Sequence, residues 1–173
     1  RSGPGAYQLT SEDPVDEPSV ARMKPFVMTS ASEFRPGPPP ALDGTKFQRD
    51  LEEVKNLGGL KSTIRTSDQT EQGLFFRTPG VWPWNAVARK AIDFHQLDEL
   101  ASARALALLD TAIMDAHLAA WETKYTYNAW RPITAIRAGM SKATGDPDWT
   151  PLIATPPHPE YTCGHCVLGS AAK

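Results

Sequence analysis

The chain has 173 residues, enough for one domain with a buried core, and its 40% hydrophobic and 22% charged residues are typical of a folded globular protein rather than a disordered or fibrous one. A formal net charge of -2 gives no reason to expect binding to nucleic acid or to an anionic membrane surface. No apolar run approaches the ~18 residues that would predict a membrane span, and two cysteines are too few for a disulfide scaffold.

Residues 1–44 are rich in proline and lack a regular spacing of apolar positions. Because proline fixes φ and removes a backbone donor, this segment is predicted to be an irregular, extended arm. The arm is expected to lie on a helical body formed by residues 45–173. Its expected anchors are large apolar side chains, namely Phe26, Val27, Met28 and Phe34.

Apolar residues at helical spacing follow the arm. Helices are predicted over residues 45–59, 66–76, 82–96, 99–125, 133–139 and 165–172. The second should open at Ser67 with a capping signal, and Asp98 should cap the fourth. That fourth segment is rich in Ala and Leu and apolar on nearly every side, which predicts a central buried helix. No segment alternates apolar and polar residues, so the predicted fold class is all-α, a helical bundle.

Two cations lie near the end of the longest predicted helix. Lys124 shares a helix face with the apolar Ile113, so its side chain should point toward the interior. Arg131 precedes a proline, which disfavours helix there and predicts a break in the chain. Two cations that converge at such a break repel each other unless an anion lies between them, and an ammonium with a guanidinium suits a tetrahedral oxyanion. The alternative is that both cations interact with the helix dipole and with Glu122 or Asp115.

Both cysteines lie in the tetrapeptide Cys163-Gly164-His165-Cys166. A redox dithiol of the thioredoxin type needs a preceding strand, which the sequence does not predict. A zinc site is disfavoured because the adjacent His165 and Cys166 cannot easily bind one ion, and no second ligand pair is evident. A third interpretation is that Gly164 turns the chain into a helix whose first N–H groups face an anion, with His165 beside it. A plainer one is that His165 caps this helix.

Two segments in order carry a family resemblance. KYTYNAWRP, residues 124–132, and TPPHPEYTCGH, residues 155–165, resemble the first two signature motifs of the vanadium-dependent haloperoxidase and type 2 phosphatidic acid phosphatase superfamily. Likeness to the bacterial haloperoxidase-like branch extends over roughly residues 23–173 and includes TSDQTEQ and WNAVAR. The resemblance implies a helical bundle that holds vanadate, or phosphate, in a cationic pocket.

The resemblance also implies roles for single residues. Lys124 and Arg131 would bind the oxygens of the oxyanion. Gly164 would donate its backbone N–H, and His165 would be the acid/base. Cys163 stands where the family has a serine that hydrogen-bonds the oxyanion, and a thiol is the weaker donor.

Two activities follow from the same pocket. In a haloperoxidase, vanadate would be the cofactor, and hydrogen peroxide and a halide the substrates, with Lys124 polarising the peroxide. In a phosphatase, a phosphomonoester would be the substrate and His165 would protonate its leaving group. A non-catalytic structural or storage protein that retains the fold is the third alternative.

The third family motif, with the histidine that bonds vanadium, has no counterpart in the sequence and is expected after residue 173. Three further histidines, His95, His117 and His158, do not lie in such a motif. The 45–173 domain is therefore expected to be truncated at its C-terminus. Helix faces left uncovered predict a homo-oligomer or association with a second chain. The resemblance favours a secreted or periplasmic location, while the first residues show no signal peptide.

Overall fold

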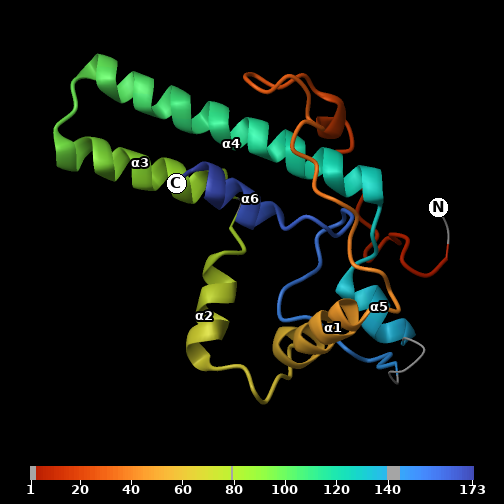
Figure 1. The fold of residues 1–173 in the computed structure, drawn as a ribbon. Coiled ribbons are helices and arrows are strands. Elements are labelled where there is room, and N and C mark those ends of the chain that lie inside the picture. The colour runs from red at the N-terminus through yellow and green to blue at the C-terminus, as the bar shows by residue number, and fades with distance from the viewer. Residues whose placement is uncertain (1–2, 79, 140–144) are drawn as a thin grey trace.

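The computed structural model describes residues 3–78, 80–139 and 145–173 (Figure 1). Over these residues the predicted all-α fold class is confirmed, since β-pairing is limited to isolated bridges. A short 3-10 helix, η1 (Val20–Arg22), lies in the N-terminal segment. The α-helices are α1 (Thr45–Gly58), α2 (Ser67–Phe75), α3 (Val81–His95), α4 (Glu99–Tyr127), α5 (Pro132–Ala138) and α6 (Gly164–Ala171). None of the described helices is long and apolar enough to cross a membrane.

Side-chain caps define where α2, α4 and α6 begin. The Asp98 side chain caps α4 as predicted, accepting a hydrogen bond from the Ala101 backbone N–H at 2.8 Å. The capping box of α2 lies one residue earlier than expected, because Thr66 rather than Ser67 is the N-cap and pairs reciprocally with Gln69. Each such cap stabilises its helix by about 1 kcal/mol.

Helix α4 is central but is buried over only part of its length. It packs against α3, α6 and the η1 segment, and α1 packs separately against α5 (Figure 1). Its buried residues begin at Ile113, whereas Leu100 is 81% exposed and Leu108 is 60% exposed. The prediction of a helix buried throughout is therefore wrong for its N-terminal half, where the described residues leave the apolar side chains uncovered.

The N-terminal segment is held by backbone contacts rather than by the predicted apolar anchors. Phe26, Val27 and Phe34 are all at least 70% exposed. The carboxylate of Asp115 on α4 instead accepts hydrogen bonds from the backbone N–H groups of Phe26, Val27 and Met28, at 2.7, 2.8 and 3.0 Å. Burial alone would raise the pKa of Asp115, but these three donors outweigh it and the pKa is lowered. Asp115 therefore attaches residues 26–28 to the buried half of α4, and Glu122 attaches Arg35 of the same segment to it.

The end of α4 is shaped by backbone pairing with two distant segments. Asn128 ends the helix in the left-handed conformation, with φ 51°. Its carbonyl accepts a hydrogen bond from the Tyr7 N–H at 2.8 Å, and the next carbonyl, of Ala129, accepts one from the Glu160 N–H at 2.9 Å. These contacts bring residues 156–163 to the C-terminal end of α4, where Lys124 and Arg131 lie.

Candidate functional site

Lys124 lies in the last turn of α4 with its side chain 1% exposed, pointing inward as predicted. Its ammonium donates a hydrogen bond to the carbonyl of Pro159 at 3.1 Å, and within the described residues this is its single hydrogen bond, although an ammonium has three donors. The Nζ atom lies 5.9 Å from the ring centre of Trp121. Burial, together with the positive charge of Arg131 and against the opposing effect of Glu160, lowers the pKa of Lys124 to about 8.

Arg131 is the N-cap residue of α5 and is extended, with φ -80° and ψ 151°, because a proline follows it. Its side chain is buried, and one terminal nitrogen, Nη1, donates to the carboxylate of Glu160 at 2.5 Å. The other, Nη2, donates to the Pro156 carbonyl at 3.3 Å. The Nε atom is buried and has no hydrogen-bond partner among the described residues. A buried guanidinium donor without a partner is costly unless an acceptor binds there.

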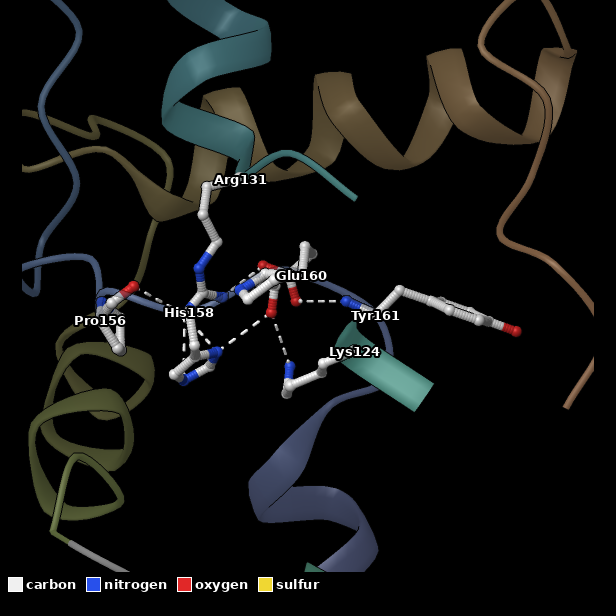
Figure 2. Close-up of polar contacts among 7 residues, drawn as sticks. Lys124, Arg131, Pro156, His158, Glu160 and Tyr161 are labelled. Carbon is white, nitrogen blue, oxygen red and sulfur yellow. Dashed lines mark hydrogen bonds and ion pairs between the residues drawn. The ribbon is translucent and has the colours of Figure 1, made fainter. Parts of the chain in front are cut away.

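Arg131 forms an ion pair with Glu160, a carboxylate that the sequence did not single out, while Lys124 binds the neighbouring Pro159 carbonyl (Figure 2). Glu160 accepts the hydrogen bond from Arg131, and its other oxygen lies 3.3 Å from the Tyr161 backbone N–H. Burial would raise the pKa of Glu160, but Arg131 and Lys124 together lower it below its usual value. Glu160 is therefore ionised at neutral pH and offsets one of the two positive charges.

The partners considered for the two cations, Glu122 and Asp115, are engaged elsewhere. Glu122 forms an ion pair with Arg35 of the N-terminal segment. Asp115 binds the backbone of residues 26–28. Glu122 and Asp115 are therefore not the partners of Lys124 and Arg131.

His158 is the second residue of this site that sequence reasoning missed. It is buried, its ring lies against Trp121 with centroids 5.1 Å apart, and its Nδ1 is 3.0 Å from the Pro159 carbonyl oxygen. Burial, and then the charges of Arg131 and Lys124, lower its pKa to about 4. The imidazole is therefore neutral at neutral pH and adds no third positive charge to the site. The signal in the sequence was that His158 lies two positions before Glu160, within the 155–165 segment that carries the family resemblance.

The residues of the predicted turn lie at the start of α6, which begins at Gly164 and packs on α4. A side chain at Gly164 would bring its Cβ to 3.3 Å from the Trp121 ring, so the helix approaches α4 closely because glycine is there. Cys163 is the N-cap, and its sulfur accepts a hydrogen bond from the Cys166 N–H at 3.3 Å. Cys163 lies close enough to Lys124 that a negative charge on its sulfur would raise the pKa of the Lys124 ammonium.

His165 is placed apart from the cations. It is exposed, and its Nε2 lies 3.0 Å from the carbonyl oxygen of Thr78. The structure therefore brings Lys124 and Arg131 together, with Cys163 and Gly164 beside them, and turns His165 toward the segment between α2 and α3. A cavity of about 690 Å³ is lined by both Arg131 and His165, together with mainly apolar residues that include Phe76, Trp149 and Ile153.

The donors that remain open fit an anion better than a metal cation. Arg131 Nε and two of the Lys124 protons are available, and all are positively charged donors. Within the described ranges, no group of three or more His, Cys, Asp or Glu side chains is placed to hold a metal ion. The donor set matches a small tetrahedral oxyanion such as vanadate or phosphate.

Three comparisons with known proteins agree. A family model described as the VCPO second helical-bundle domain matches residues 104–173. The vanadium chloroperoxidase of Curvularia inaequalis is 32% identical over a match that covers 66% of this chain and 24% of that protein. The crystal structure of the first bacterial vanadium-dependent iodoperoxidase matches with a TM-score of 0.85 and 31% identity, over 98% of this chain and 43% of that chain.

This chain therefore spans about a quarter of the chloroperoxidase and less than half of the iodoperoxidase chain. The matches include the segments that hold both cations, the half-buried Glu160 carboxylate and the start of α6. With the all-α fold and the site described above, they show that the chain belongs to the vanadium haloperoxidase superfamily.

Proposed function

We propose that this chain supplies the positively charged side of a vanadate-binding pocket, formed by Lys124 and Arg131, and that the pocket serves peroxide-dependent oxidation of a halide. The observation that carries the proposal is the pair of neighbouring buried cations with open donors, Arg131 Nε and the Lys124 ammonium. The names of the two relatives, a chloroperoxidase and an iodoperoxidase, support this activity class over other uses of an oxyanion pocket. The proposal assigns no ligand to vanadium itself among residues 1–173.

The residues of this pocket have separate tasks in the proposal. Arg131 keeps its charge at every physiological pH and would bind oxygen atoms of vanadate through Nε. Lys124, with a pKa of about 8, is mostly protonated at neutral pH and would donate to a further oxygen. Gly164 would offer its backbone N–H at the start of α6, where the helix dipole favours an anion. When bound, vanadate supplies the peroxide-activating chemistry.

In the proposal, His165 acts as an acid or base when a group bound in the adjoining cavity brings the imidazole close to the oxyanion. The described geometry holds its Nε2 at the Thr78 carbonyl, on the wall of the cavity that Arg131 also lines. Hydrogen peroxide and a halide are small enough to enter a space of this volume. The proposal therefore places substrate entry on the α2–α3 side of Arg131.

A paired experiment tests the proposal. The thermal unfolding midpoint of the chain would be measured with vanadate and with phosphate, and bromide or iodide oxidation would be followed after peroxide is added. Arg131→Gln should abolish stabilisation by vanadate. The matched control Arg49→Gln, at an exposed arginine whose side chain is 72% accessible, should retain it.

The outcomes separate the alternatives. Stabilisation by vanadate that depends on Arg131 supports the pocket, and halide oxidation in the same preparation supports the haloperoxidase. Stabilisation by phosphate with hydrolysis of a phosphomonoester, and without halide oxidation, would replace it with a phosphatase. A chain that responds to neither ion would be the non-catalytic protein.

A further inference from the structure

The two cysteines of the chain lie close together at the start of α6, and the proposed function gives neither of them a task. Cys163 is the N-cap, and Cys166 is in the first turn, three residues later. The Cys166 backbone N–H donates to the Cys163 sulfur at 3.3 Å. Both thiols are free and exposed. A solvent-accessible pair of thiols at this spacing can close to a disulfide with little movement of the helix.

We propose that Cys163 and Cys166 are a peroxide-reactive dithiol that closes to an intramolecular disulfide. The sulfur of Cys163 attacks one oxygen of hydrogen peroxide and breaks the O–O bond, which releases water and leaves a sulfenic acid on Cys163. The Cys166 sulfur then attacks the Cys163 sulfur and releases a second water. The two thiols lose two electrons and two protons in total, and one peroxide is reduced to two waters.

The contacts around the pair assign these two roles. The Cys166 backbone N–H donates to the Cys163 sulfur, so a negative charge is better stabilised on Cys163 than on Cys166. The hydrogen bond to Cys163, followed by burial, raises the pKa of Cys166, which suits a thiol that stays protonated until the second step. The buried ammonium of Lys124 lies on the Cys163 side of the pair. Cys163 is therefore the attacking residue and Cys166 the resolving one.

The disulfide has a consequence for the pocket, which rests on the proposed function. Cys163 precedes Gly164 at the start of α6, and in the proposed pocket its S–H would be a weak donor to the bound oxyanion. A disulfide removes that donor and joins Cys163 to the first turn of α6. Oxidation is therefore expected to weaken vanadate binding severalfold, so that excess peroxide would lower the activity that consumes it.

The reaction is tested on the reduced full chain without vanadate. After one equivalent of hydrogen peroxide, the intact mass should fall by two hydrogens and both titratable thiols should be lost, and dithiothreitol should restore both. Cys166→Ser should stop at a sulfenic acid that dimedone traps. Cys163→Ser, which keeps a good N-cap and so preserves the start of α6, should give no dimedone adduct.

Several results would overturn the inference: both thiols surviving peroxide that oxidises free cysteine, disulfides that form only between chains, or direct conversion to sulfinic acid. A vanadate titration of the oxidised and reduced chains then tests the link to the pocket. An intramolecular disulfide that leaves vanadate affinity unchanged would remove the link and keep the dithiol, while failure of vanadate to bind either form would count against the proposed function alone.

Discussion

Glu160 determines how much positive charge the site offers to an anion. Its carboxylate accepts a hydrogen bond from Arg131 at 2.5 Å and lowers the net charge contributed by Arg131 and Lys124. A guest oxyanion would have to share Arg131 with this carboxylate or displace it. Glu160 therefore competes with a bound anion for the Arg131 guanidinium.

Replacing Glu160 should strengthen oxyanion binding. Glu160→Gln keeps the shape of the side chain and removes its charge, so vanadate affinity should rise about tenfold, since 1.4 kcal/mol corresponds to that factor. Calorimetric titration at pH 7 measures the change, with Glu122→Gln, which breaks an ion pair away from the site, as the matched control. Weaker binding in Glu160→Gln would instead make Glu160 a residue that positions Arg131.

The stability of the protein should depend on pH through Lys124. Its pKa is lowered from 10.5 to about 8, so between these values the unfolded state binds more protons and stability rises with pH. Relative to Lys124→Met, the free energy of unfolding of the natural chain should increase by about 3 kcal/mol from pH 7 to 10.5. Urea unfolding of both proteins at stepped pH values measures this. A constant difference would show that Lys124 is not a desolvated ammonium.

At the residue scale, the sequence indicated two cations but not their partner. The spacing along the helix predicted that Lys124 points inward, and the proline after Arg131 predicted the break. Glu160 and His158 reach the cations only because residues 129 and 160 pair through their backbones, a contact between distant segments. Helical periodicity describes one element at a time, so it could not predict this convergence.

At the scale of elements, Asp115 connects the N-terminal segment to α4. Three successive N–H groups share one carboxylate, an arrangement that the spacing of apolar residues does not reveal. Helix existence was predictable from periodicity and caps. Which part of α4 is buried was not, because an apolar face in a sequence does not identify what covers it.

Removing the negative charge of Asp115 should weaken the attachment of residues 26–28 to α4. Asp115→Asn leaves one acceptor oxygen for three donors, so the segment should lose about 1–3 kcal/mol of local stability. Hydrogen exchange at the amides of Phe26, Val27 and Met28 should accelerate about tenfold or more. Asp110→Asn, on the same helix but bonded to Asn85, is the matched control. Unchanged exchange in Asp115→Asn would mean that other contacts hold the segment.

At the scale of the whole molecule, apolar side chains remain uncovered on α2, α3 and the first half of α4. The most exposed large ones there are Phe75, Trp82, Phe94, Leu100 and Leu108. Monomeric proteins rarely expose a contiguous apolar area of this kind. We therefore expect the isolated chain to associate with itself, which is one of the two kinds of association that the sequence predicted. Sedimentation velocity should show a dimer or larger species that Trp82→Ser with Phe94→Ser reduces, and a compact monomer would contradict the expectation.

Helix α2, which carries the exposed Phe75, also lines the cavity shared by Arg131 and His165, through Gly73. The placement of Lys124 and Arg131 depends on local sequence and was predictable. The orientation of His165 was not, because its imidazole lies against the Thr78 carbonyl, 87 positions earlier in the chain.

The most direct test observes the Arg131 side chain itself. In a spectrum that resolves arginine Nε–H groups by nitrogen and proton chemical shift, titration with vanadate should move the Arg131 Nε–H signal downfield and slow its exchange with water. Addition of chloride at the same ionic strength should do neither. An Arg131 signal that stays unchanged while vanadate shifts other arginines would contradict the placement of an oxyanion between Arg131 and Lys124.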